Sequence, residues 1–540
     1  MSRAAQIPDP PATIGVAGAG TMGAGIAQLA CLAGARTLLH DPLPDALQRG
    51  LERVGAQLER GAERGRWGEA EASAAAARIE GAPALEDLKP CELVIEAAPE
   101  RLELKRELFA RLSEDLVAED CVLATNTSSL LVTAIATAAK RPERVVGMHF
   151  FNPPPVMRLL EVVAGAQTSK RALAVARAAG EAMGKHVIEA VDGPGFLVNR
   201  CNRPFGLEAL KLLQERVAPL EEIDRICRMG GGFRMGPFEL MDLVGVDTGL
   251  EVSRSFYEQS FGEPRWRPSP ITVRTVAAGR LGRKSGRGYY DYSKGAGRHR
   301  PEDPPPRPAG RGDGLIVIAG DSPLAVELTA AAQSSGWEVV SPPEAVDREP
   351  PFLILDLAGA EVPDVPLQGG PQAICCAAGS LGGLDPAGGA VGFNALPPLG
   401  EVSLVELTRG PDSTQAAASA TEQFFGALGK HAVWVRDTPG LVLGRIVCQV
   451  INEAAFALGE GVGSAEDIDA GMVHGLNYPR GILAWADEIG LDQVLSALDA
   501  LFEELREERY RAAPALRALV WAGKLGRQTG EGFFAHEVAR

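Results

Sequence analysis

The sequence lacks the features that place a protein in a membrane, in the secretory route or on a nucleic acid. No apolar run approaches the length of a membrane span, and the N-terminal residues have no hydrophobic region of the signal-peptide kind. The formal net charge is −16, whereas nucleic acids are bound by basic surfaces. We therefore expect a cytoplasmic protein with neither a membrane nor a nucleic acid as partner.

The cysteines are few and carry no metal or redox pattern. There are eight among 540 residues, scattered except for the adjacent Cys375 and Cys376, and none has zinc-ligand or redox-motif spacing. We expect no metal site and a reducing compartment. A chain of this length exceeds one hydrophobic core, and 46% hydrophobic and 23% charged residues are ordinary for a soluble protein of several domains.

The most informative motif opens the chain. Residues 13–17 form a buried-strand pattern that runs into Gly18-Ala19-Gly20-Thr21-Met22-Gly23 and a helix of small residues. This strand–turn–helix context is the one that the dinucleotide fingerprint requires. The first glycine permits the tight turn, the second leaves room for a pyrophosphate at the helix N-terminus, and the third permits close packing of helix and strand. The residues predicted to bind the cofactor here are Gly18, Gly20, Thr21, Met22 and Gly23.

A second strand pattern, residues 36–40, ends at Asp41. A carboxylate at this distance accepts hydrogen bonds from the ribose 2′-OH and repels a 2′-phosphate, so it favours NAD over NADP. The alternative is a glycine-rich turn that binds no nucleotide. Strand, helix and Asp41 together favour the cofactor site.

A histidine and a glutamate lie on two strands that a proline-rich turn connects. Residues 145–149 end at His149, the turn holds Asn152, and residues 158–163 contain Glu161. An imidazole beside a carboxylate gains basicity and a fixed tautomer, as a general base for alcohol oxidation needs. Taken alone, His149 is more often a satisfied strand-end histidine. Its pairing with Glu161 in a chain with a nicotinamide site favours catalysis.

Two further polar positions remain open from the residues alone. Ser128 and Ser129 follow a strand and face the ligand crevice of an open α/β sheet, yet either also suits the N-cap of the next helix. Asn199 lies on a helix that follows a Gly-Pro-Gly linker. It is either a hydrogen-bond donor to a carbonyl or a tolerated polar residue.

Seven sequence blocks make the chain resemble a known family. In order over residues 13–292 they are GAGTMGAGIAQ, IEAAPERLELK, NTSSL, HFFNPPPVMRLLEVV, GPGFLVNR, MGPFELMDLVG and GRKSGRGYYDY. They resemble those of the NAD-dependent L-3-hydroxyacyl-CoA dehydrogenases of fatty acid β-oxidation. The last two are most similar to the 3-hydroxyadipyl-CoA and 3-hydroxybutyryl-CoA dehydrogenases of phenylacetate catabolism.

The resemblance implies a role for each matching residue. It implies oxidation of an L-3-hydroxyacyl-CoA to the 3-oxoacyl-CoA, with His149 as base and Glu161 as its partner. Ser128 and Asn199 contact the substrate oxygens. The implied contacts with the nicotinamide side of NAD are Glu100, Lys105, Asn152 and Lys284. Arg60, Arg64 and Arg66, in the helical excursion after Asp41, are implied coenzyme A contacts, with a solvated helix face as the alternative.

The second half repeats the first. Adding 245 aligns the helical segments without a gap: Pro194-Gly195 with Pro439-Gly440, Arg200 with Arg445, Gly236 with Gly481, and Gly245 with Gly490. Most positions that carry the chemistry are replaced. In the nucleotide-binding segment the shift is 302, and there Gly20 becomes Ser322, Gly23 becomes Ala325 and Asp41 becomes Pro343. At the shift of 245, His149 becomes Asn394 and Asn199 becomes Gly444. Glu161 alone keeps its counterpart, Glu406. We expect the second copy to bind no NAD and catalyse nothing.

The predicted fold is an α/β Rossmann-type NAD-binding domain with an all-α C-terminal domain, followed by a degenerate tandem copy of both. The expected boundaries are residues 1–192, 193–292, a flexible linker at 293–313, 314–436 and 437–540. In the family the helical domain forms the dimer interface. The tandem copy therefore implies an intramolecular pseudo-dimer with one working site.

Two other functions fit part of the pattern. An NAD-dependent dehydrogenase of a free β-hydroxy acid, of the L-gulonate type, shares the fold and the His–Glu pair but needs no excursion for coenzyme A. A catalytically retired structural homologue of the λ-crystallin kind keeps the fold without turnover. The intact Ser128, His149, Glu161 and Asn199 argue against the latter, since a retired enzyme loses such residues, as the second copy has.

Overall fold

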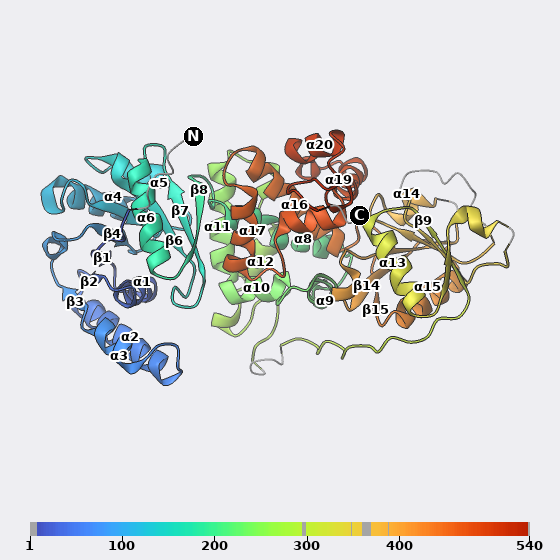
Figure 1. The fold of residues 1–540 in the computed structure, drawn as a ribbon, viewed down its shortest axis with the longest axis horizontal. Coiled ribbons are helices and arrows are strands. Elements are labelled where there is room, and N and C mark those ends of the chain that lie inside the picture. Colours follow the sequence, from blue (N-terminus) through green and yellow to red (C-terminus); the bar gives the residue numbers. More distant parts are fainter. Residues whose placement is uncertain (1–7, 294–298, 347, 359–368, 387, 538–540) are drawn as a thin grey trace. The chain divides into compact units, whose positions relative to one another are not determined.

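The computed structural model of the protein describes residues 8–293, 299–346, 348–358, 369–386 and 388–537 (Figure 1). The chain divides into two compact units. The first unit comprises residues up to 200 together with 461–476, and the second comprises 201–460 and 477–540. No helix among the described residues is both long and apolar enough to cross a membrane.

The first unit is built on an eight-stranded sheet of order β3-β2-β1-β4-β5-β6-β7-β8 in its described residues. Neighbours are parallel except β6 and β7, which pair antiparallel. This is the doubly wound arrangement expected for a dinucleotide-binding domain. Its strands are β1 (Thr13–Ala17), β2 (Arg36–His40), β3 (Ile79–Ala82), β4 (Leu93–Glu96), β5 (Val122–Thr125), β6 (Val145–Phe150), β7 (Leu159–Ala164) and β8 (His186–Val191).

Helices cover this sheet because its strands are apolar on both faces. Helices α1 and α6 pack with alternate strand residues in one continuous core. Helix α2 turns an apolar stripe inward and pairs with α3 beside β3, forming the excursion that follows Asp41. The helices are α1 (Thr21–Leu32), α2 (Pro44–Glu63), α3 (Glu69–Ala76), α4 (Leu102–Arg111), α5 (Val132–Ala136), α6 (Lys170–Ala182), α7 (Val198–Cys201) and α17 (Ala465–Leu476).

Helix α17 comes from the second half of the sequence but packs on β7 and β8 of the first unit. The amide of Val191 at the end of β8 donates to the carbonyl of Val462 at 3.0 Å. A Cβ on Gly475 would lie 2.7 Å from the side chain of Leu159, so a larger residue there would force that side chain to shift. The first nucleotide domain is therefore completed by a segment of the second copy.

The second unit contains a seven-stranded sheet of order β10-β9-β11-β12-β13-β14-β15 in its described residues. It repeats the first sheet from β1 to β8 without a counterpart of β3. Between β10 and β11 the described residues contain only a short 3₁₀ turn, Pro342–Ala345, where the first copy has α2 and α3. The strands are β9 (Leu315–Ala319), β10 (Glu338–Val340), β11 (Leu353–Asp356), β12 (Gln372–Cys375), β13 (Val391–Asn394), β14 (Leu404–Arg409) and β15 (His431–Trp434).

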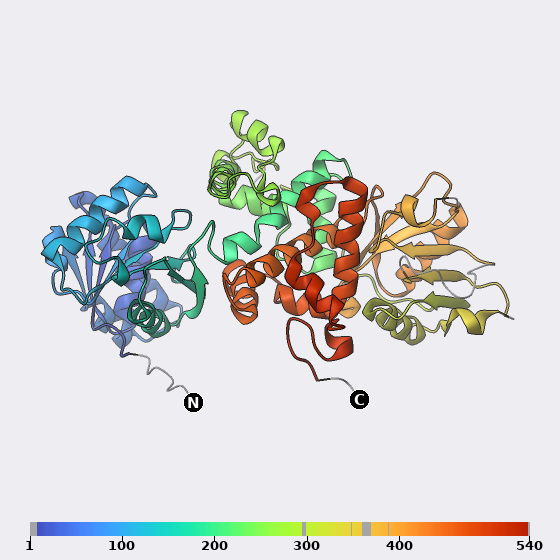
Figure 2. The same cartoon turned by 90° about the horizontal axis from the view of Figure 1, so that it is seen from above.

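Two sets of helices lie against one another in the second unit, one from each copy (Figure 2). Helices α8 and α16 form the main contact, and α16 is buried along nearly its whole length. The helices are α8 (Arg203–Gln214), α9 (Leu220–Gly231), α10 (Pro237–Val244), α11 (Val246–Gln259), α12 (Pro270–Ala277), α13 (Pro323–Ser334), α14 (Leu381–Leu384), α15 (Gln415–Ala427), α16 (Leu443–Gly459), α18 (Ile482–Ile489), α19 (Leu491–Leu505) and α20 (Pro514–Trp521).

The second sheet makes the same contact with a helical segment as the first. The amide of Arg436, just after β15, donates to the carbonyl of Val217 at 2.9 Å. Arg436 corresponds to Val191 of the first copy, and Val217 corresponds to Val462 of the second, each at the shift of 245. Each nucleotide-type domain thus packs on the helical segment of the other copy.

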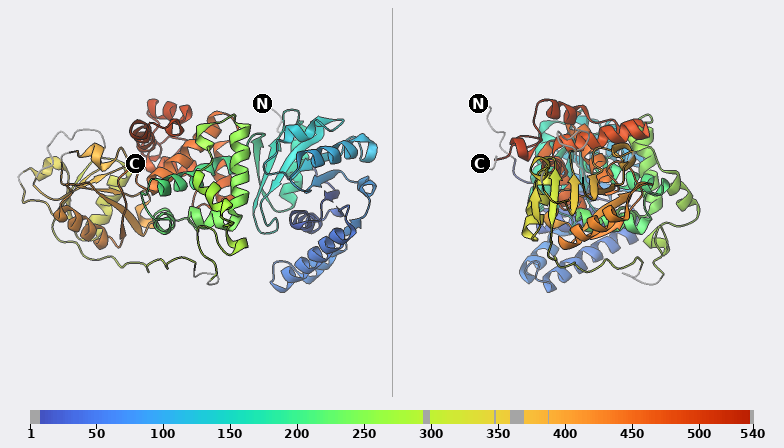
Figure 3. Two further views of the ribbon diagram at one scale, coloured as in Figure 1. Left: turned by 180° about the vertical axis from the view of Figure 1, so that it is seen from behind. Right: turned by 90° about the vertical axis from the view of Figure 1, so that its right-hand side faces the viewer.

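Within the predicted linker at 293–313, the described residues 299–313 lie along the second unit (Figure 3). Asp303 accepts from Arg228 of α9 at 2.7 Å, and Arg300 donates to Glu239 of α10 at 2.9 Å. Farther on, the amide of Gly310 donates to the end of α15. Asp303 and Arg300, two of the alternating charges of this segment, are therefore paired with residues on the helices.

Candidate active site

The glycine turn between β1 and α1 has the geometry that the fingerprint predicts. Gly18 has φ +113°, and a Cβ there would lie 2.6 Å from the carbonyl of Ala97. A Cβ on Gly23 would lie 1.7 Å from the Gly18 carbonyl, whereas one on Gly20 would meet nothing within 4 Å. Gly20 caps α1 without a side-chain hydrogen bond, so amides at this helix start remain for an anion. The turn fits a pyrophosphate.

Asp41 lies beside this turn at the end of β2. Its carboxylate accepts from the amide of Ala19 at 2.9 Å and from the amide of Leu43 at 3.0 Å. Arg53 of α2 donates to the hydroxyl of Thr21 at 3.2 Å, a neighbour of the turn that the sequence did not reveal. The carboxylate is fixed next to the glycine turn, where a ribose bound with its pyrophosphate on α1 is placed.

We expect Asp41 to set the cofactor preference. NAD should be used with a kcat/KM at least about a hundredfold above that for NADP, because a 2′-phosphate meets like charge. In Asp41→Asn the ratio of kcat/KM for NAD to that for NADP should fall, mainly because KM for NAD rises. Steady-state kinetics with both cofactors measure this, and equal kcat/KM values in the wild type contradict the placement of Asp41.

His149 and Glu161 are cross-strand neighbours in the antiparallel β6–β7 pair. The imidazole Nδ1 lies 2.6 Å from Oε2 of Glu161, and the two residues are 6% and 0% exposed. The other carboxylate oxygen accepts from the amides of Leu197 and Val198 at 3.2 and 3.0 Å, where α7 begins. The carboxylate is therefore held from two sides, and it fixes the orientation of the imidazole.

Two aromatic rings flank the imidazole of His149. The ring of Phe151 lies 4.6 Å away and that of Phe196 lies 5.8 Å away, centroid to centroid. Together with the burial of both partners, these rings restrict access of water to the pair. The geometry is that of a positioned proton acceptor whose Nε2 is left for a substrate.

The loop that carries Ser128 is organised by Glu100. Its carboxylate oxygen Oε1 accepts from the hydroxyl of Thr127 at 2.6 Å and from the amides of Ser128 and Ser129 at 2.9 and 3.1 Å. Burial alone would raise the pKa of Glu100, but the Lys105 ammonium, 3.3 Å away, and these hydrogen bonds hold it below its ordinary value. Glu100 stays charged and holds the loop.

Lys105 is 1% exposed and also pairs with Glu96 at 2.6 Å. The other oxygen of Glu96 accepts from Thr125. Asn126 then accepts from the amide of Phe150, next to His149, and so ties the serine loop to the strand of the base. The sequence did not identify Glu96 as part of this network; its only signal was a carboxylate ending an otherwise apolar strand.

The structure places the remaining predicted residues as follows. Asn199 is half-buried on α7, and Asn152 is exposed in the β6–β7 turn. Lys284 belongs to the second unit, where its ammonium pairs with Asp247 at 2.6 Å. Contacts of Glu100, Lys105, Asn152 and Lys284 with NAD stay predictions.

The predicted coenzyme A arginines line one cavity of about 300 Å³ in the first unit. Arg60, Arg64 and Arg66 are exposed at its side, at the end of α2 and in the turn after it. Trp67 forms a further wall, with its indole N–H donating to the carbonyl of Leu58 at 2.9 Å. Prolines of the β6–β7 turn close the cavity on the side of His149's strand.

Family models of the 3-hydroxyacyl-CoA dehydrogenases match this chain. The NAD-binding domain model matches residues 13–193, and the C-terminal domain model matches twice, at residues 195–292 and 440–536. The chain belongs to the 3-hydroxyacyl-CoA dehydrogenase family. It is therefore an NAD-dependent oxidoreductase, and the duplicated helical domain is confirmed.

The proteins that this chain resembles are of two lengths, one close to that of the whole chain and one about half of it. The 3-hydroxyadipyl-CoA dehydrogenase of Escherichia coli K12 is 35% identical over 94% of this chain and 96% of its own length. A crystal structure of 3-hydroxybutyryl-CoA dehydrogenase from the same organism aligns with TM-score 0.80 and 33% identity, covering 95% of this chain and 99% of that one. The human mitochondrial hydroxyacyl-coenzyme A dehydrogenase is 37% identical over 51% of this chain and 90% of its own.

In the second copy of the dehydrogenase fold, Asn394 and Glu406 occupy the same cross-strand register as the histidine and glutamate of the first. Glu406 accepts from the amides of Val442 and Leu443 at 2.7 and 3.0 Å, as α16 begins. Burial raises the pKa of Glu406 to about 8. Glu406 thus binds the start of a helix as Glu161 does in the first copy, and this contact needs no histidine.

The degenerate glycine turn of the second copy is filled by its own side chain. Ser322 caps α13, and its hydroxyl accepts from the amide of Ala325 at 3.3 Å. This amide belongs to the helix start that binds an anion in the intact motif. Gly320 keeps φ +103°, so the turn survives while its donors are used internally.

Proposed function

We propose that the enzyme oxidises an L-3-hydroxyacyl-CoA to the 3-oxoacyl-CoA at a single site in the first copy, with His149 as the general base. The 2.6 Å contact between His149 and Glu161 carries this proposal. Bound NAD supplies the hydride acceptor. The contact with Glu161 places the Nδ1 proton between the two groups, so Nε2 takes the hydroxyl proton of the substrate.

Ser128 and Asn199 are proposed to contact the substrate oxygens. Ser128 sits on the loop that Glu100 and Asn126 tie to the strand of His149. Asn199 lies one residue beyond Val198, whose amide binds Glu161, so base and amide share one support. Glu161 also stabilises the imidazolium that forms when His149 takes the proton.

We propose that the arginine-lined cavity of about 300 Å³ receives the coenzyme A moiety. Arg60, Arg64 and Arg66 offer guanidinium groups to its phosphates, in a chain whose overall charge is −16. The excursion that carries them is absent from the described part of the second copy. This agrees with a second copy that binds no substrate.

The acyl group is proposed to be adipyl. This rests on the 3-hydroxyadipyl-CoA dehydrogenase of Escherichia coli, which matches nearly the whole length of both chains, the duplicated half included. A place in phenylacetate breakdown is proposed only on the resemblance of the sequence blocks to enzymes of that pathway. The name 3-hydroxybutyryl-CoA dehydrogenase is carried both by relatives of half this length and by the full-length crystal structure from Escherichia coli, so kinetics must decide between the two acyl groups.

A panel of 3-hydroxyacyl-CoA esters tests this proposal. We expect kcat/KM for 3-hydroxyadipyl-CoA to exceed that for 3-hydroxyhexanoyl-CoA, which has the same chain length without the distal carboxylate, by at least about tenfold. Free 3-hydroxyadipate serves as the control for the coenzyme A requirement. Equal values for the two esters contradict the adipyl assignment but leave the reaction intact, whereas turnover of the free acid contradicts the acyl-CoA substrate.

We further propose that the two helical domains form an intramolecular pseudo-dimer. In the second unit, Arg445 of α16 donates to Glu208 of α8 at 2.6 Å and to Glu215 at 2.7 Å. Arg445 belongs to the second copy and both glutamates belong to the first, so these contacts join the two copies. The second copy then serves as the partner that a single-copy relative takes from another subunit.

A further inference from the structure

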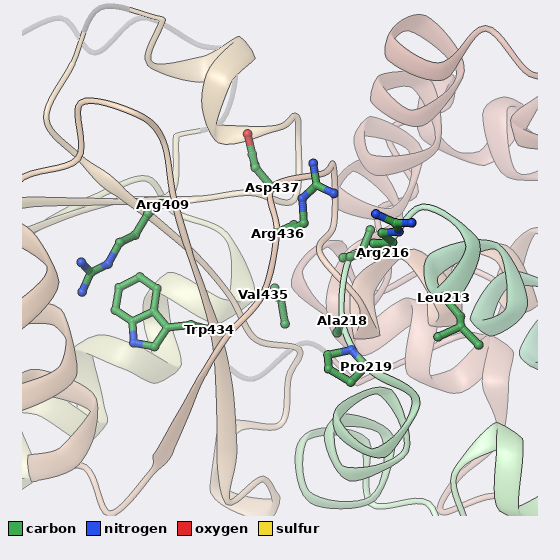
Figure 4. Close-up of a pocket in the computed structure, with 10 residues that line it drawn as sticks. Leu213, Arg216, Ala218, Pro219, Arg409, Trp434, Val435, Arg436 and Asp437 are labelled. Atoms are coloured by element: carbon green, nitrogen blue, oxygen red, sulfur yellow. The ribbon is translucent and has the colours of Figure 1, made fainter. Parts of the chain in front are cut away.

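A second cavity, of about 890 Å³, lies in the second compact unit where the chain after α8 meets the end of β15 (Figure 4). None of its lining residues has a part in the site described above. Its volume lies within the range of small-molecule sites. Its walls combine apolar residues such as Val217 and Val435 with three arginines, Arg216, Arg409 and Arg436.

The three arginines have no ion pair with any carboxylate of the described residues. Arg409 lies over the ring of Trp434, 4.2 Å from its centroid, and Arg436 reaches the carbonyl of Glu215 only at 3.5 Å. In a chain with 70 acidic and 54 basic residues, three unpaired arginines around one cavity are unexpected. They give the cavity a local positive charge in a protein whose net charge is negative.

The carboxylates nearest in sequence are engaged elsewhere. Asp437, which also lines the cavity, accepts from the amides of Leu381 and Gly382 at 2.8 and 2.9 Å. Glu215 binds Arg445 at 2.7 Å. Asp437 is the one carboxylate among the lining residues, so the three arginines still leave the cavity with an excess of positive charge.

The fold itself does not require these arginines, because the equivalent position in the other copy holds no arginine in any of the three cases. Their counterparts 245 positions away are Ala164 for Arg409, Val191 for Arg436 and Gly461 for Arg216. Gly461 has φ +71°, and Arg216 adopts φ +58° at the equivalent place. A left-handed conformation is costly for a residue with a Cβ, and such strain is often found at functional sites.

We propose that this cavity binds a phosphorylated small molecule, with the phosphate held between Arg216 and Arg436. Figure 4 shows the side chains of Arg216 and Arg436 near one another, and those of Arg409 and Trp434 apart from them on the other side of β15. Guanidinium groups bind phosphate through paired N–H donors. The cavity exceeds the size of phosphate alone, so it suits a ligand of nucleotide size whose non-phosphate part meets apolar lining residues such as Val217 and Val435.

The test is calorimetric titration of the full chain with pyrophosphate. The titration is carried out with saturating NAD⁺ and acetoacetyl-CoA, so that the proposed catalytic site is filled. These two compounds do not react with each other, because both are already oxidised. We expect one saturable pyrophosphate site per chain, tighter binding of ADP, and none of adenosine. Arg216→Gln/Arg436→Gln should weaken pyrophosphate binding at least tenfold while dehydrogenase turnover stays unchanged. Arg506→Gln, also an exposed arginine at positive φ, is the matched control with wild-type binding.

Three results would overturn the proposal. The first is the absence of saturable binding of both pyrophosphate and ADP. The second is equally tight binding of succinate, which would show that the cavity does not select phosphate. The third concerns Arg216→Gly, in which glycine adopts the left-handed conformation freely, so that Tm should not fall while pyrophosphate binding weakens. A marked fall in Tm with unchanged binding would assign Arg216 to the fold. Loss of turnover with intact pyrophosphate binding would instead concern the proposed catalytic site alone.

Discussion

His149→Gln is expected to lower kcat at least about a hundredfold while leaving NADH affinity within a fewfold of the wild type. Removal of a positioned general base costs about 10²–10⁴ in rate. Glutamine keeps a hydrogen-bonding side chain beside Glu161 but takes no proton from the alcohol. Stopped-flow and steady-state kinetics measure the loss, and fluorescence titration measures NADH binding.

The matched control uses the internal duplication. Glu161→Gln should also lower kcat strongly, because it removes the carboxylate that bonds the imidazole at 2.6 Å. Glu406→Gln alters the same helix-capping contact in the second copy, where Asn394 replaces the histidine, and should leave kcat unchanged. Near wild-type turnover in His149→Gln, or equal losses in the two glutamate variants, would refute the assignment of the base.

Arg445→Ala is expected to destabilise the second unit by about 3–5 kcal/mol, the usual cost of leaving a buried charge without its partner. Arg445 is 0% and Glu208 2% exposed, and Tyr510 donates to the same carboxylate at 2.9 Å. Burial alone would raise the pKa of Glu208, but Arg445 holds it below its ordinary value, so the glutamate stays charged. Chemical denaturation followed by tryptophan fluorescence measures the loss.

Two control variants separate charge from packing at this contact. Arg445→Met/Glu208→Met removes both charges and should regain most of the stability, because apolar replacement of a buried pair is often neutral. Tyr510→Phe removes one hydrogen bond and should cost only about 1 kcal/mol. A loss below about 1 kcal/mol in Arg445→Ala would show that this ion pair does not join the two copies.

The parts of the site that local sequence encodes could be predicted. The glycine turn follows from spacing, because tight turn, ligand room and close packing each demand glycine at a fixed position. The His149–Glu161 pair follows from an antiparallel connection that brings its two strands into register. That the second copy performs no chemistry stays a prediction, which rests on serine and asparagine at the positions of glycine and histidine.

Other features depend on contacts between distant parts of the chain. Glu100 holds a loop 28 residues away, and no spacing rule connects them. The packing of α17 on the first sheet requires knowing that each copy lends a segment to the other. Composition predicted a flexible connection at 293–313, whereas Asp303 and Arg300 find charged partners on α9 and α10. Composition shows which charges are present but not what faces them.

The number of NADH molecules bound per chain tests most directly whether one copy performs the chemistry and the other supports it. The glycine turn of the first copy leaves its helix start open, while Ser322 fills that of the second. Titration of the full chain, monitored by NADH fluorescence and by calorimetry, should give a stoichiometry of one, and Asp41→Asn or Gly20→Val should weaken that single site. Two NADH per chain, or one site that persists unchanged in Gly20→Val, would contradict the account.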